Sequence, residues 1–191
     1  VLLGDSITEA WRGSSYGEPR IDRAELPDVL QETLAKRWPS PLVLGISGDQ
    51  TQHLLWRIAH GEISQGMADD PRLLVVVLIG TNNLAAGHSP EEVADGIHAV
   101  TERLLNSTRG RVLVNAVFPR GDGLRALAQL CPPRCAKNGR PLRSFRPSID
   151  RVNYLLNRSI QSKLQRDHPD RLRFIDCGRH LLGGLKAGGN G

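Results

Sequence analysis

An uninterrupted apolar run, RLLVVVLIG at residues 72–80, places the firmest constraint on how this chain folds. A strand with one face in water alternates apolar and polar residues, whereas this run is apolar from Leu73 to Ile79. Such a strand is buried on both faces, which is typical of the centre of a parallel sheet between two layers of helices. The run therefore predicts an α/β fold.

Shorter apolar runs flank this strand, and segments with helical spacing lie between them. The other predicted strands are residues 1–3, 42–46, 112–118 and 172–175. The predicted helices are residues 26–37, 51–59, 90–109 and 147–164. Ser89, Pro90 and Glu92 mark the start of the third helix. Ser89 is the N-cap, Pro90 suits the first helical position, and Glu92 completes a capping box with Ser89. The alternation predicts a doubly wound, three-layer α/β sandwich.

With 191 residues, the chain is expected to form a single domain, residues 1–191, with enough length for a real core. Residues 121–146 interrupt the alternation of predicted strands and helices. Their centre, CPPRCAKNGRP, is rich in proline, glycine and charged residues. We interpret 121–146 as a loop insertion.

The net charge of +5 permits weak attraction to anionic partners. Much of it lies in one stretch, at Arg134, Lys137, Arg140, Arg143, Arg146 and Arg151. No array of aromatic residues or known nucleic-acid module accompanies them, so we expect a solvated basic loop and no nucleic-acid partner. No run approaches the ~20 apolar residues of a membrane span.

Three cysteines do not make a disulfide framework. Cys131 and Cys135 lack the second pair that a structural zinc site needs, and Cys177 is interpreted as a small buried thiol. This cysteine usage favours a reducing compartment such as the cytoplasm.

Polar and glycine residues follow the first three predicted strands, where each strand ends. These turns are residues 4–6 (Gly-Asp-Ser), 45–49 (Gly-Ile-Ser-Gly-Asp) and 80–83 (Gly-Thr-Asn-Asn). Ligands of open α/β sheets bind at the carboxyl ends of the strands. Each turn alone is more typical of a helix cap or loop, but together they offer a serine nucleophile and oxyanion donors for acyl transfer.

Three of these segments resemble the first sequence blocks of the GDSL, or SGNH, hydrolases: GDSITE, GISGDQTQHLLWR and VVVLIGTNN. The branch they resemble most is that of the platelet-activating-factor acetylhydrolase catalytic subunits. The resemblance continues through residues 117–121 and RPSIDRVNYLL to FIDCG, and so spans nearly the whole chain.

The resemblance implies that Ser6 is the nucleophile. The Gly48 N–H and the Asn82 side chain would form an oxyanion hole, with the Ser6 N–H as a third donor. It further implies that the fold is a flavodoxin-like sandwich with five parallel strands. The implied activity is that of a serine ester hydrolase that cleaves short acyl esters. It requires no metal or organic cofactor, and it is compatible with a homodimer. A nucleotide-binding domain is disfavoured, because neither glycine-rich phosphate loop is present.

Members of this family carry an Asp-x-x-His element after the last strand, whose histidine takes the serine proton. No Asp-x-x-His follows the last predicted strand in this sequence. Asp176 and His180 follow the last predicted strand but are spaced Asp-x-x-x-His, and Asp167-His168 precedes that strand. We therefore expect a chain truncated at both ends, without its last helix, that is nearly inactive as it stands. The alternative is a non-catalytic binding module of the same fold.

Overall fold

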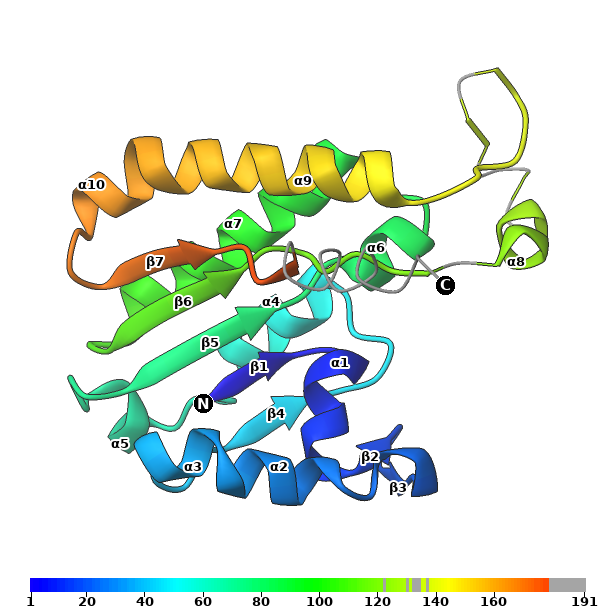
Figure 1. The fold of residues 1–191 in the computed structure, drawn as a ribbon. Coiled ribbons are helices and arrows are strands. Elements are labelled where there is room, and N and C mark those ends of the chain that lie inside the picture. The colour runs from blue at the N-terminus through cyan, green and yellow to red at the C-terminus, as the bar shows by residue number, and fades with distance from the viewer. Residues whose placement is uncertain (122, 130, 132–134, 137, 179–191) are drawn as a thin grey trace, which may run out of the picture.

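The computed structural model describes residues 1–121, 123–129, 131, 135–136 and 138–178 (Figure 1). Five parallel strands form the central sheet, in the spatial order β4-β1-β5-β6-β7. They are β1 (Leu2–Gly4), β4 (Val43–Gly45), β5 (Leu74–Leu78), β6 (Arg111–Asn115) and β7 (Leu172–Ile175). Numbered along the chain, this order is 2-1-3-4-5, the flavodoxin-like arrangement, so the predicted fold class is confirmed.

One face of the sheet is covered by α4 (Thr51–Ala59), α7 (Pro90–Ser107) and α9 (Arg146–Ser159). Val75, Val77 and Val114 are wholly buried against this layer. Helix α7 begins with the predicted capping box, in which Ser89 Oγ and the Glu92 carboxylate each accept the other residue's backbone N–H. A π-helical segment, η3 (Ile160–Leu164), and the short α10 (Gln165–Asp167) extend α9 toward β7.

The remaining elements are short. They are α1 (Ser6–Glu9), η1 (Ala10–Arg12), β2 (Ser14–Ser15), β3 (Glu18–Pro19), η2 (Ile21–Arg23), α2 (Leu26–Glu32), α3 (Leu34–Arg37), α5 (Gln65–Ala68) and α6 (Thr81–Ala85). The single helix predicted over 26–37 is broken at Thr33, whose hydroxyl donates to the Val29 carbonyl and competes with helix continuation. No helix among the described residues is long and apolar enough to cross a membrane.

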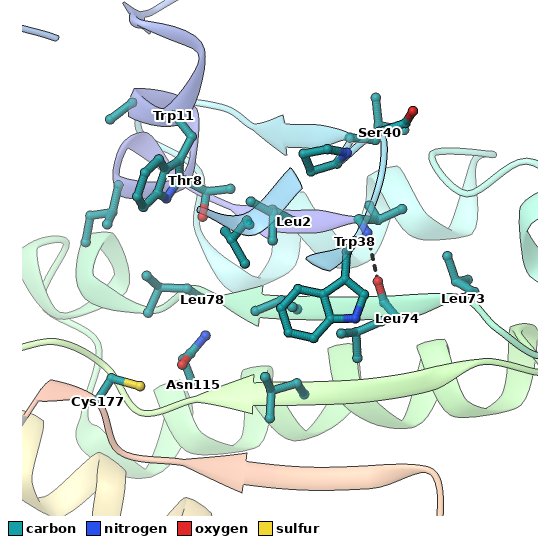
Figure 2. Close-up of a pocket in the computed structure, with 18 of the residues that line it drawn as sticks. Leu2, Thr8, Trp11, Trp38, Ser40, Leu73, Leu74, Leu78, Asn115 and Cys177 are labelled. Carbon is teal, nitrogen blue, oxygen red and sulfur yellow. Dashed lines mark hydrogen bonds between the residues drawn. The ribbon is translucent and has the colours of Figure 1, made fainter. Parts of the chain in front are cut away.

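The second face of the sheet borders a cavity of about 1200 Å³. Leu74, Val76 and Leu78 of β5 line it, opposite the buried Val75 and Val77. Figure 2 shows Trp38 beside Leu74, with Leu2 and, on the α1 side, Trp11 lining the same cavity. The expected absence of a last helix concerns the chain after β7, where residues 179–191 lie outside the described part.

Within residues 121–146 the structure has a short helix, α8 (Leu124–Gln129), and a disulfide between Cys131 and Cys135. The cysteine spacing did not lead us to expect this bridge; the two Cα atoms lie 4.8 Å apart, within the range a disulfide spans. An oxidised pair removes the argument from cysteine usage for a reducing compartment. Cys177 is exposed rather than buried, because β7 ends two residues before it.

Two of the basic residues in and after this segment are paired. Arg146 bonds Asp150, and Arg151 bonds Glu91 on α7. Arg134 and Lys137 lie outside the described residues.

Candidate active site

The turns after β1, β4 and β5 begin side by side at one edge of the sheet. Gly4 pairs with Gly45 on one side and with Leu78 on the other, so all three strands end at the same level. These turns carry Ser6, Gly48 and Asn82. The sheet therefore brings the three turns of the sequence prediction together.

Ser6 is the first residue of α1, and the Asp5 side chain caps this helix by accepting the Ile7 N–H at 2.9 Å. N–H groups in the first turn of a helix have no partner within it, so the Ser6 N–H can bind a ligand. A Cβ on Gly4 would lie 2.2 Å from both the Leu78 carbonyl and the Thr8 hydroxyl. Only glycine lets β1 turn into α1 this close to β5.

Gly48 lies in a turn closed by a hydrogen bond from the Asp49 N–H to the Ile46 carbonyl, 3.1 Å. Its φ of 87° is left-handed, as the third residue of a type II turn requires. Arg57 of α4 holds the next residue, since its guanidinium lies 2.8 Å from the Asp49 carboxylate and bonds the Leu44 carbonyl. Among the described residues, the Gly48 N–H has no hydrogen-bond acceptor.

Asn82 and Asn83, at the start of α6, have different partners. Asn83 is buried and ties α6 to α4: its Oδ1 accepts the Thr51 N–H at 2.9 Å. Asn82 is half-buried and donates one amide hydrogen to the Asp49 carbonyl at 2.8 Å. An amide has two N–H bonds, so Asn82 retains a second donor beside the Gly48 turn.

Two buried carboxylates lie at the two ends of α1: Asp5 caps its start, and Glu9 is its last residue. Burial, followed by the charge of Asp49, raises the pKa of Asp5 to about 6, against the effect of the Ile7 N–H. Burial also acts to raise the pKa of Glu9, but hydrogen bonds from Ser47, Gly17 and Ser14 outweigh it and lower that pKa to about 2. Glu9 therefore remains ionised throughout the neutral range.

The structure brings no histidine to Ser6 within the described part of the chain, and the Ser6 hydroxyl has no hydrogen-bond partner there. His53, which is on α4, lies 3.8 Å from the Asp49 carboxylate. His168 precedes β7, at the far edge of the sheet from Ser6. His180, the other member of the weak candidate dyad, lies outside the described residues.

Asp176 and Cys177 diverge after β7. Asp176 lines a second cavity of about 730 Å³, with Asn153 and Tyr154 of α9. Cys177 lines the same cavity as Ser6 (Figure 2). The pairing of Asp176 with His180 stays a prediction.

Sequence reasoning missed two charged residues that hold the site together. Glu9 accepts the N–H of Ser47, the residue before Gly48, at 2.7 Å. Arg120 donates to the Thr81 carbonyl and hydroxyl at 3.3 and 3.2 Å, and its guanidinium lies 5.1 Å from the centre of the Phe145 ring. Both residues lie within quoted motifs, but nothing in the motifs indicates which distant loop each one contacts.

Several relatives share part of this sequence, and two serve as examples. The bovine (Bos taurus) platelet-activating factor acetylhydrolase IB subunit alpha1 is 44% identical over 83 residues, 42% of this chain and 33% of that protein. The chicken (Gallus gallus) subunit alpha2 is 37% identical over 112 residues, 58% of this chain and 44% of that protein. The matches thus cover between about a third and a half of these relatives.

Solved structures share the fold at low identity. A GDSL-like lipase from Bacteroides thetaiotaomicron aligns with a TM-score of 0.57 and 19% identity, over 92% of this chain and 66% of that one. An acetylxylan esterase from Geobacillus stearothermophilus aligns with a TM-score of 0.57 and 15% identity, over 97% and 78%. The model of the GDSL-like lipase/acylhydrolase family matches residues 2–185. This protein therefore belongs to the GDSL-like lipase/acylhydrolase family.

Proposed function

We propose that this chain is the core of a serine esterase in which Ser6 attacks the ester carbonyl and becomes acylated. The observation that supports this proposal most is that the turns after β1, β4 and β5 lie side by side. Ser6, at the start of α1, is therefore next to the two turns that carry the Gly48 N–H and the Asn82 amide. In the proposed mechanism the N–H groups of Ser6 and Gly48 and the Asn82 amide stabilise the oxyanion. In serine hydrolases one such donor contributes about 3–4 kcal/mol to the transition state.

We propose short acyl esters as the substrate class. Two of the similar proteins are named for acetyl esters, an acetylhydrolase and an acetylxylan esterase. Ser6, Ile7 and Trp11 line one end of the large cavity, so its apolar wall is positioned to receive the hydrocarbon part of an ester. No metal or organic cofactor takes part in this proposal.

We further propose that this chain acylates slowly, since the described residues place no base at Ser6 and no Asp-x-x-His follows β7 in the sequence. A serine without a base is a poor nucleophile. The same observation favours a second candidate, a non-catalytic module that binds acylated ligands through the oxyanion turns.

Chemical rescue separates these two functions. Imidazole is added as a soluble base to p-nitrophenyl acetate and the purified chain, and acetylation of Ser6 is followed by peptide mass spectrometry. For the esterase, the imidazole-dependent rate exceeds that of Ser6→Ala by about tenfold or more, since a base restores the missing proton acceptor. The exposed Ser64→Ala, remote from the site, is the matched control and should behave as wild type.

Equal imidazole-dependent rates for wild type and Ser6→Ala, with no acetyl group on Ser6, would favour the binding module. Rapid turnover without imidazole, lost in Ser6→Ala, would show instead that the chain supplies its own base.

A further inference from the structure

The Glu9 side chain is wholly buried at the end of α1, one helical turn after Ser6. Its carboxylate accepts four hydrogen bonds. Oε1 accepts the Ser14 hydroxyl at 3.0 Å and the Gly17 N–H at 2.8 Å. Oε2 accepts the Ser47 N–H at 2.7 Å and the Tyr16 N–H at 3.2 Å. An ionised carboxylate offers about four acceptor sites and no donor, so its bonding capacity is filled.

These bonds join three segments, two of them neighbours in sequence and the third, at Ser47, 38 residues from Glu9. Glu9 belongs to the Ser6 helix, and Ser47 precedes Gly48. Residues 14–17 are strand β2 and the turn that follows it, which we call the Tyr16 loop. The loop also contacts the Gly48 turn directly, through the Ser15 and Ser47 hydroxyls, 3.2 Å apart. A Cβ built on Gly48 would lie 3.7 Å from the Tyr16 ring. Both the turn and the loop are thus fixed relative to Ser6 through one side chain.

The loop adopts a conformation that needs such support. Tyr16 has a φ of 53°, which side-chain-bearing residues seldom adopt, and its side chain is 77% exposed. Its N–H bond to Glu9 therefore acts against local strain. A buried carboxylate that only filled space would cost free energy, because burying a charge requires compensation.

We propose that Glu9 is a positioning residue for the oxyanion hole: through the Ser47 N–H it sets the Gly48 turn at its working distance from Ser6. This inference rests on the proposed function of Ser6 and Gly48. Because an oxyanion hole stabilises the transition state only when its donors are fixed in place, a displaced turn should lower the acylation rate without weakening ester binding.

The test uses Glu9→Gln, which keeps the shape but replaces one acceptor oxygen by an NH2 group that faces N–H donors. We expect the amide NMR signals of Ser47 and Gly48 to shift, and Ser47 hydrogen exchange to accelerate by about tenfold or more. We expect the imidazole-rescued acylation rate at saturating ester to fall by about tenfold, with half-saturation changed by less than about twofold. Glu9→Asp keeps the charge but has a shorter side chain. It should show the same pattern to a smaller degree, with a lower acylation rate at saturating ester and little change in half-saturation.

Two controls separate positioning from general destabilisation. Ser14→Ala removes one bond to the same carboxylate but leaves the Ser47 bond, so it should loosen the loop and leave acylation near wild type. Glu91→Gln removes a charge from an exposed ion pair between α7 and α9 and should change nothing at the site. All rates are measured where circular dichroism shows each variant fully folded.

The inference is overturned if Ser6 acylates at the wild-type rate in Glu9→Gln, or if the Ser47 and Gly48 amides are unperturbed. It is also overturned if Ser14→Ala loses as much rate as Glu9→Gln. Failure of the proposed function gives a different result, because Ser6→Ala would then react like wild type whatever Glu9→Gln does.

Discussion

The two carboxylates at the ends of the Ser6 helix differ in the hydrogen bonds they accept, although both are almost wholly buried. Asp5 is 1% exposed and Glu9 0%. Asp5 accepts the Ile7 N–H on one oxygen, and its Oδ2 has no partner within the described chain, whereas Glu9 accepts four hydrogen bonds. Burial raises the pKa of Asp5 to about 6, while the donors bring that of Glu9 to about 2. At this edge of the sheet, hydrogen-bond donors rather than burial decide which carboxylate keeps its charge as the pH falls below about 6.

From this difference we expect Glu9→Ala to be the most damaging single change. It leaves the buried N–H of Ser47 and the part-buried N–H of Gly17 without their acceptor, and a buried N–H in that state costs about 1–3 kcal/mol. We expect a loss of about 4 kcal/mol in the free energy of unfolding, measured by urea denaturation at pH 7. The exposed Glu91→Ala is the control and should change little. A loss in Glu9→Ala no larger than in the control would mean that the four bonds add nothing to stability.

Acid should remove the contribution of Glu9 in a defined window. The unfolded chain protonates this group near the ordinary glutamate pKa of 4.5, and the folded protein only at a pKa of about 2. Its folded pKa is lowered, so its stabilisation is complete above pH 4.5 and is lost as the pH falls to about 2, by about 3 kcal/mol. Urea denaturation at several pH values should give a shallower acid slope for Glu9→Gln than for wild type. Parallel slopes would contradict the prediction.

Asp5 should act in the opposite sense. Its folded pKa of about 6 lies above the ordinary aspartate pKa of 3.8, so the folded protein is the form that holds the proton. Stability should therefore fall as the pH rises from 3.8 to 6, by about 2 kcal/mol after allowance for relaxation. Asp5→Asn cannot ionise and still caps α1, because asparagine caps as well as aspartate. We expect it to exceed wild type by about 2 kcal/mol at pH 8 and to match it at pH 4. A variant less stable than wild type at pH 8 would show that the charge is needed.

The fold and the candidate site differ in how much of them the sequence predicts. The continuous run at 72–80 and the capping box at Ser89 depend on neighbours in sequence, and both appear in the structure where they were predicted. The role of Glu9 depends on residues 14–17 and 47, which only the folded chain brings together. The Cys131–Cys135 bridge likewise depends on local geometry that the spacing does not determine. Patterns predict elements, whereas long-range polar bonds need the assembled structure.

The smallest effect concerns Gly48, in the turn that Glu9 holds. An alanine there would contact the Tyr16 ring at 3.7 Å, an ordinary distance, so the cost comes from the φ of 87° alone. We expect Gly48→Ala to lower the free energy of unfolding by about 1 kcal/mol. Gly66, in α5 with open space around it, is the matched control, and Gly66→Ala should stabilise the protein by about 0.5–1 kcal/mol.

The Gly48→Ala penalty also measures whether Glu9 fixes the turn. If the Ser47 bond to Glu9 holds the backbone of Gly48 at positive φ, a turn released by Glu9→Gln can relax around the new side chain. The two changes should then be less than additive, with a coupling of about 0.5 kcal/mol or more in a double-mutant cycle. Additive losses would mean that the conformation of Gly48 is set by the Ile46–Asp49 hydrogen bond and the Arg57–Asp49 ion pair instead. In that case the ionised Glu9 would support the Tyr16 loop alone.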